Sequence, residues 1–101
     1  NSIKLHAKLL YNNIKILLQN NDFSILETNY IAVTFEALVS LKPFIHKKYK
    51  IEILNYIFYL FYLLQQRISI NGLYLFLNNI DARIDITCHI LNGFFDLLSQ
   101  K

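Results

Sequence analysis

Apolar residues recur every three or four positions along the first twenty residues, which is the spacing of one face of an amphipathic helix. That face consists of Ile3, Ala7, Leu10, Ile14 and Leu17. Lys4, Lys8 and Lys15 share a second face. The pattern predicts a helix over residues 2–19, and the polar run at 19–22 ends it.

A second helix is predicted to begin at Ser24. The sequence Ser-Ile-Leu-Glu at 24–27 has the form of a capping box, in which Ser24 caps the helix and Glu27 reaches back to the amide of Ser24. Two adjoining apolar faces follow, and they indicate that this helix contacts two neighbours. They consist of Ile31, Phe35 and Leu38, and of Leu26, Tyr30, Val33 and Ala37. Pro43 disfavours helical backbone at Lys42 and so ends the helix there.

Residues 51–64 form the most apolar stretch of the chain, and only Glu52 and Asn55 within it are neither aliphatic nor aromatic. A membrane-spanning helix needs about 20 predominantly apolar residues. The run from Ile53 to Leu64 would be only about 18 Å long as a helix. We therefore expect a buried helix over about 48–66 at the centre of a helical protein, with an element at a membrane interface as the alternative.

A short helix is predicted over about 70–79, a turn at 78–81 and a longer helix over 82–99, with Asp81 as the cap of the longer one. The longer helix carries two apolar stripes and a polar face. The stripes consist of Ile84, Cys88, Leu91, Phe95 and Leu98, and of Ile86, Ile90, Phe94 and Leu97, and the polar face of Asp85, His89, Asn92 and Asp96. The predicted fold is therefore all-α, with four to five antiparallel amphipathic helices around the central one, arranged as a bundle or as a helical repeat.

The composition leaves too few polar residues to cover every helix face. The length suits a single domain over residues 1–101, of which 54% are hydrophobic and 17% charged. We therefore expect apolar helix faces to contact another protein, the rest of a longer chain or a second copy of this chain. The lack of methionine favours a fragment of a longer chain, and the single cysteine favours an intracellular location, cytoplasmic or nuclear.

The sequence contains no recognisable catalytic or metal-binding constellation. His6, His46 and His89 lie on three separate predicted elements. Cys88 and His89 are adjacent on a helix and point about 100° apart, so they do not form a local metal site or a nucleophile pair. No glycine-rich phosphate loop is present in the sequence. These features predict a non-catalytic protein without a metal or cofactor, in which Cys88 belongs to the core.

Two groups of residues are candidates for partner binding. The basic segment 42–50 contributes Lys42, His46, Lys47, Lys48 and Lys50, and the last helix contributes Ile86, Phe94 and Leu97. The apolar group favours a protein–protein interaction or scaffold module. The basic group gives an alternative function, the binding of nucleic acid or of an anionic membrane. An ordinary solvated loop between two apolar helices is the third interpretation of the basic segment.

Residues 17–41 and 74–98 follow a similar pattern, in which an apolar helix, an Asn/Asp turn and a second apolar helix succeed one another. At an offset of 59 residues (84 − 25) the matched pairs are Ile25 and Ile84, Thr28 and Thr87, Ile31 and Ile90, Phe35 and Phe94, and Leu38 and Leu97. Together with Asp-Ala-Arg-Ile at 81–84, this pattern resembles the paired helices of HEAT or armadillo-type repeats. The resemblance implies a scaffold within a longer array, although the offset exceeds the usual period of about 40–47 residues.

An unrelated helical bundle is the alternative to a repeat. Helix 48–66 is also similar to the apolar central helix of the viral Bcl-2-like fold. That second resemblance implies a bundle that sequesters a helix of a partner protein.

Overall fold

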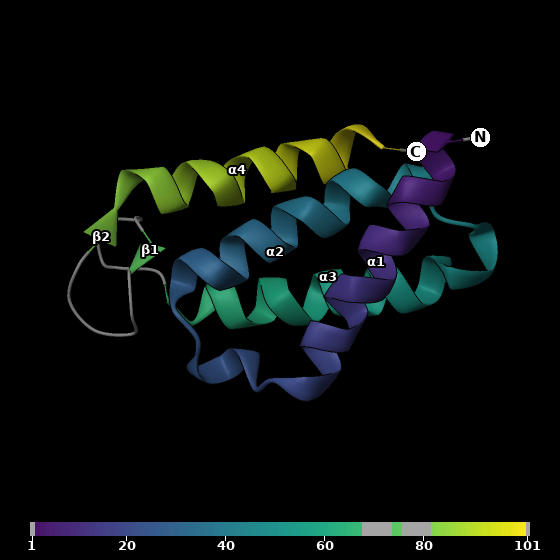
Figure 1. Ribbon diagram of the computed structural model, residues 1–101. Helices are drawn as coiled ribbons and strands as arrows, with labels where there is room; N and C mark the ends of the chain where they lie inside the picture. The colour runs from purple at the N-terminus through teal and green to yellow at the C-terminus, as the bar shows by residue number, and fades with distance from the viewer. Residues whose placement is uncertain (1, 68–73, 76–81, 101) are drawn as a thin grey trace.

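The computed structural model describes residues 2–67, 74–75 and 82–100. The α-helices of this part of the chain are α1 (Ser2–Asn20), α2 (Thr28–Leu41), α3 (Lys50–Gln65) and α4 (Ile84–Ser99). Short 3-10 helices lie in the connections between α1, α2 and α3, namely η1 (Phe23–Ile25), η2 (Lys42–Phe44) and η3 (Lys47–Tyr49). In Figure 1, α4, α2 and α3 run alongside one another, and α1 crosses them at a steep angle. The predicted all-α bundle is confirmed.

The central helix of the bundle is α2, not the segment 48–66 that was expected there. α2 contacts α1, α3 and α4. Its buried side chains are Thr28, Ile31, Ala32, Phe35, Leu38 and Val39. α3 buries only one side, and its outer side leaves Ile51 75%, Phe58 56% and Tyr62 61% exposed. The hydroxyl group of Tyr62 allows that residue to face water, but Ile51 and Phe58 are exposed without such a group, so the apolar pattern of α3 did not indicate which of its sides is covered.

The buried face of α1 is rotated from the predicted one. It consists of Ala7, Tyr11, Ile14 and Leu18, whereas Ile3, Leu10 and Leu17 are 59%, 48% and 53% exposed. Tyr11 replaces Leu10 in the core because its hydroxyl has a hydrogen-bond partner there, the carboxylate of Glu52 on α3. A buried tyrosine hydroxyl without a partner would be costly.

The capping box predicted at Ser24 is wrong. Oδ1 of Asp22 accepts hydrogen bonds from both the backbone amide and the hydroxyl of Ser24, so Asp22 caps η1 and Ser24 lies within it. α2 begins four residues later than predicted, at Thr28, and Glu27 supplies no side-chain cap. Asp22 thus binds the amide of Ser24, the donor that Glu27 would bind in a capping box, which explains the shift.

α2 ends at Leu41, two residues before Pro43. Lys42 nevertheless keeps helical backbone angles (φ −50°, ψ −44°), contrary to the expectation that the proline would exclude them. The chain then tightens into η2, in which Pro43 occupies an early position that needs no amide donor. The turn therefore redirects the chain without unwinding it at Lys42.

The C-terminal part differs from the prediction at one described point. Tyr74 and Leu75, expected in a short helix over 70–79, form the strand β1 (Tyr74–Leu75), which pairs antiparallel with β2 (Ala82–Arg83). The rest of that predicted helix, and the cap at Asp81, lie outside the described residues. α4 begins two residues after the predicted start and ends where predicted. Across the described ranges, none of the helices combines the length and the hydropathy needed to cross a membrane.

Candidate functional site

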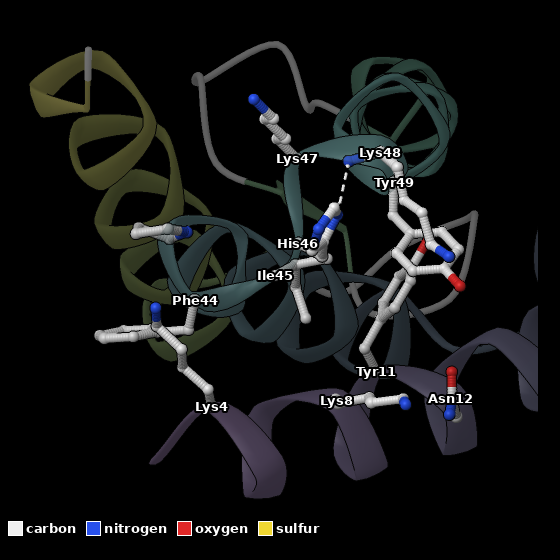
Figure 2. Close-up of a pocket in the computed structure, with 11 residues that line it drawn as sticks. Lys4, Lys8, Tyr11, Asn12, Phe44, Ile45, His46, Lys47, Lys48 and Tyr49 are labelled. Atoms are coloured by element: carbon white, nitrogen blue, oxygen red, sulfur yellow. Dashed lines mark hydrogen bonds between the residues drawn. The ribbon is translucent and has the colours of Figure 1, made fainter. Parts of the chain in front are cut away.

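A pocket lies between the N-terminal half of α1 and the basic segment 42–50. Its volume is about 580 Å³, within the usual range for ligand-binding clefts. Its lining includes five residues that can carry positive charge and no aspartate or glutamate. These are Lys4, Lys8, His46, Lys47 and Lys48. We call this feature the basic pocket; Figure 2 shows Lys4 and Lys8 on the α1 side, the side chain of Ile45 directed toward α1, and the ring of His46 directed toward the amide of Lys48.

The backbone of the segment 45–49 is held in place by the burial of Ile45 and by a hydrogen bond to the ring of His46. Ile45 is buried at the floor, with 6% of its surface exposed. Nδ1 of His46 accepts a hydrogen bond from the amide of Lys48 at 3.1 Å, which caps η3 (Figure 2). In the neutral ring the proton must therefore sit on Nε2. His46 thus presents a donor beside the lysines of the pocket.

A cluster at the edge of the basic pocket fixes α1 to α3. The hydroxyl of Tyr11 donates to Oε1 of Glu52 at 2.6 Å, and Nζ of Lys15 lies 3.0 Å from the same oxygen. Nζ of Lys15 also lies 5.4 Å and 5.5 Å from the ring centroids of Tyr11 and Tyr49. These contacts neutralise Lys15, so the lysine face predicted on α1 divides into two pocket lysines and one structural lysine.

Burial and hydrogen bonding in this cluster shift the pKa values of Tyr11 and Glu52 in opposite directions. Burial, followed by the hydrogen bond to Glu52, raises the pKa of Tyr11. The hydrogen bond from Tyr11, followed by the one from Lys15, lowers the pKa of Glu52. Glu52 is therefore a charged acceptor and Tyr11 a neutral donor throughout the physiological range.

Two of the predicted basic residues do not line the pocket. Nζ of Lys42 donates to Oε1 of Gln100 at 3.5 Å, beside the C-terminal end of α4. Nζ of Lys50 donates to the carbonyl oxygen of Lys42. Burial and the neighbouring charge of Lys42 lower the pKa of Lys50. The structure therefore brings together three of the five predicted residues of the segment and joins them to Lys4 and Lys8.

The apolar residues predicted as partner contacts on α4 lie against the protein's own bundle where they are described. The ring of Phe94 stacks on Phe61 of α3, with centroids 5.6 Å apart, and Phe61 stacks on Phe35 at 5.9 Å. Leu97 packs against the core. The side chain of Ile86 lies outside the described part of the structure.

The second apolar stripe of α4 is the one that faces outward. Leu91, Phe95 and Leu98 are 43%, 62% and 65% exposed. Cys88, predicted in the core, is exposed on the same stripe. We call these four residues the outer stripe of α4. The helix thus has one apolar side against α2 and a second apolar side in solvent.

Gly93 determines which side of α4 faces α2. A Cβ atom at this position would lie 2.8 Å from Cε2 of Phe35 and 3.3 Å from Cα of Glu36. The two helices therefore approach more closely than any side chain at position 93 permits. Polar contacts flank the approach, from Nδ1 of His89 to Oε1 of Glu36 at 3.1 Å and from Ser40 to Asp96 at 3.3 Å.

The fold and these surfaces define a small helical bundle with a basic pocket at one end of α1 and an exposed apolar stripe on α4. No protein-family model, no curated protein and no solved structure matches this chain. Within the described ranges, no group of three or more His, Cys, Asp or Glu residues is arranged to hold a metal ion.

Proposed function

We propose that the protein is a non-catalytic interaction module that binds an amphipathic helix of another protein along the outer stripe of α4. The observation that carries this proposal is that α4 has two apolar sides and only one of them is covered. Ile90 on the inner side is 2% exposed, whereas Phe95 on the outer side is 62% exposed. Large apolar surfaces on soluble proteins mark contact sites.

The spacing of the outer stripe suits a helical partner. Cys88, Leu91, Phe95 and Leu98 follow one another at intervals of three, four and three residues, which is the seam spacing along which helices pack side by side. An amphipathic partner helix would place its own apolar anchors against this seam. We also propose that the protein is intracellular, which is the location that its single cysteine favours.

The stripe alone accounts for weak binding. Covering three half-exposed large apolar side chains would contribute about 2–5 kcal/mol before the costs of association. A micromolar complex needs about 8 kcal/mol. The partner must therefore also contact surface beside α4. In a helical-repeat architecture, the next helix pair of a longer chain would supply such a partner.

Sedimentation of the isolated chain tests the proposal, because two copies can cover the same stripe when no other partner is present. We expect concentration-dependent association as the concentration approaches the millimolar range, in line with the weak binding that the stripe alone provides, and we expect Phe95→Glu to abolish it. Phe58→Glu is the matched control, since Phe58 is also exposed, at 56%, but lies on α3. Monomeric behaviour of the unaltered chain, or equal effects of the two substitutions, would contradict binding through α4.

A further inference from the structure

The basic pocket collects positive charge from two parts of the chain that are distant in sequence. Lys8 comes from α1, and Lys47 and Lys48 come from η3. Glu52, which borders the pocket through Tyr11, has its Oε1 occupied by Tyr11 and Lys15. Within the described residues, the side chains of Lys8 and Lys47 form no hydrogen bond or ion pair. The pocket is therefore complementary to a negatively charged ligand.

The aromatic residues of the pocket indicate which kind of anion fits. Binding of single-stranded nucleic acid without base readout depends on aromatic faces on which bases stack. Tyr11 is buried, with 2% of its surface exposed. The ring of Tyr49 has Nζ of Lys15 and Nζ of Lys48 within 5.5 Å and 5.1 Å of its centroid. These two tyrosine rings contact the core and the lysines and are not free to stack on a base. Phe44, the third aromatic residue of the lining, is 45% exposed, but a single exposed ring does not supply the series of aromatic faces on which successive bases stack.

The donors that remain suit carboxylate groups. Lysine ammonium groups bind carboxylates as compact point charges with freely rotating donors. Nε2 of His46 supplies an additional donor, since Nδ1 is occupied by the amide of Lys48. A cleft of about 580 Å³ accepts a few side chains of an extended segment.

We propose that the basic pocket binds a short acidic segment of another protein, whose carboxylates contact Lys8 and Lys48 from opposite walls and Nε2 of His46. This site is separate from the outer stripe of α4 and does not depend on helix docking there. Because Lys8 belongs to α1, the proposal differs from simple attraction to a charged loop. An acidic segment attracted only by the charges of residues 42–50 would bind with the same affinity whether or not Lys8 is present.

The test measures binding of a fluorescent decaglutamate peptide by polarisation at low and at high salt. We expect binding that salt weakens, and an affinity about tenfold lower in the Lys8→Gln/Lys48→Gln double variant. Lys8→Gln alone and Lys48→Gln alone should each bind decaglutamate more weakly than the unaltered protein but more tightly than the double variant. Lys42→Gln is the matched control, because it removes the same charge from the basic segment outside the pocket, and its affinity should change by less than about twofold. Circular dichroism confirms that each variant is folded.

Three outcomes would overturn the proposal. Decaglutamate does not bind at low salt, or Lys8→Gln and Lys42→Gln weaken binding equally, or an oligouridylate of the same length binds more tightly than decaglutamate. The last result would assign the pocket to nucleic acid. Phe95→Glu should leave the decaglutamate affinity unchanged, so failure at this site is distinguishable from failure of the helix-docking proposal.

Discussion

The hydroxyl of Tyr11 on α1 donates a hydrogen bond to Oε1 of Glu52 on α3 across 2.6 Å. Nζ of Lys15 contacts the same oxygen at 3.0 Å. This arrangement joins two helices whose contacting residues are 41 positions apart in the chain. It also holds the α1 wall of the basic pocket, since Tyr11 and Lys8 lie on successive turns of that helix.

Glu52→Gln should destabilise the protein by about 1–2 kcal/mol, because it replaces a charged acceptor of two hydrogen bonds by a neutral amide. Chemical denaturation followed by circular dichroism measures the change. Glu27→Gln is the matched control, since Glu27 is exposed and its side chain makes no capping bond. Equal small effects of the two substitutions would show that the link between α1 and α3 is apolar only.

The carboxylate of Glu52 makes the stability of the fold depend on pH. The hydrogen bonds from Tyr11 and Lys15 lower the pKa of Glu52 below its ordinary value of 4.5. The unfolded chain therefore takes up this proton more readily than the folded one, and the contribution of Glu52 is complete above about pH 4.5. It is lost as the pH falls through the folded pKa. Melting temperatures between pH 7 and pH 3 should fall more steeply for the unaltered protein than for Glu52→Gln, and parallel curves would refute this assignment.

Arg67 ties the end of α3 to the turn before α2. Nη2 donates to the carbonyl oxygen of Ser24 at 2.7 Å, and Nη1 donates to the carbonyl of Leu26 and to Oγ1 of Thr28. Only 4% of Arg67 is exposed. Arg67→Met keeps the apolar stem but leaves these oxygens without donors, so we expect a loss of roughly 2–4 kcal/mol in the free energy of unfolding.

Thr28→Val is the graded comparison for Arg67, because it removes one of the three acceptors and should cost about 1 kcal/mol. An Arg67→Met protein as stable as the original, or more stable, would mean that burying the guanidinium costs as much as its hydrogen bonds return.

Gly93→Ala should destabilise the protein although alanine is the better helix former. Alanine gains about 1 kcal/mol of helix propensity. The new Cβ would, however, lie 2.8 Å from the ring of Phe35 and 3.3 Å from the backbone of Glu36, and such overpacking costs about 1–3 kcal/mol. We expect a net loss of up to about 2 kcal/mol in urea unfolding. Asn92→Ala, at an exposed position of the same helix, is the control and should be neutral or stabilising.

The positions of most helices could be predicted because apolar spacing reports helical periodicity directly. α1, α3 and α4 begin and end within two residues of their predicted bounds. The side of a helix that faces the protein could not be predicted where two sides are apolar. On α4, the close approach at Gly93 turns Ile90 inward and leaves Leu91 and Phe95 exposed, and periodicity does not contain that information.

The basic pocket could be predicted only in part. Both groups of lysines are visible in the sequence, but Lys8 and Lys48 are 40 residues apart (48 − 8) and meet only because α1 crosses the bundle beside η3. The contacts of Glu52 could not be predicted either, since a single acidic residue in an apolar stretch gives no indication of its partner. Tyr11 next to two apolar residues was the available signal, because a tyrosine near a core tends to have a hydrogen-bond partner.

The most direct test of the account compares the same substitution at two adjacent residues of α4, one on each side of the helix. Phe94 stacks on Phe61, and Phe95 on the outer stripe is 62% exposed. At concentrations low enough to keep the chain monomeric, Phe94→Glu should lower the free energy of unfolding by about 2–4 kcal/mol, and Phe95→Glu should change it by less than about 0.5 kcal/mol. A loss at Phe95 as large as that at Phe94 would place the outer stripe in the protein's own core and contradict its role as a binding surface.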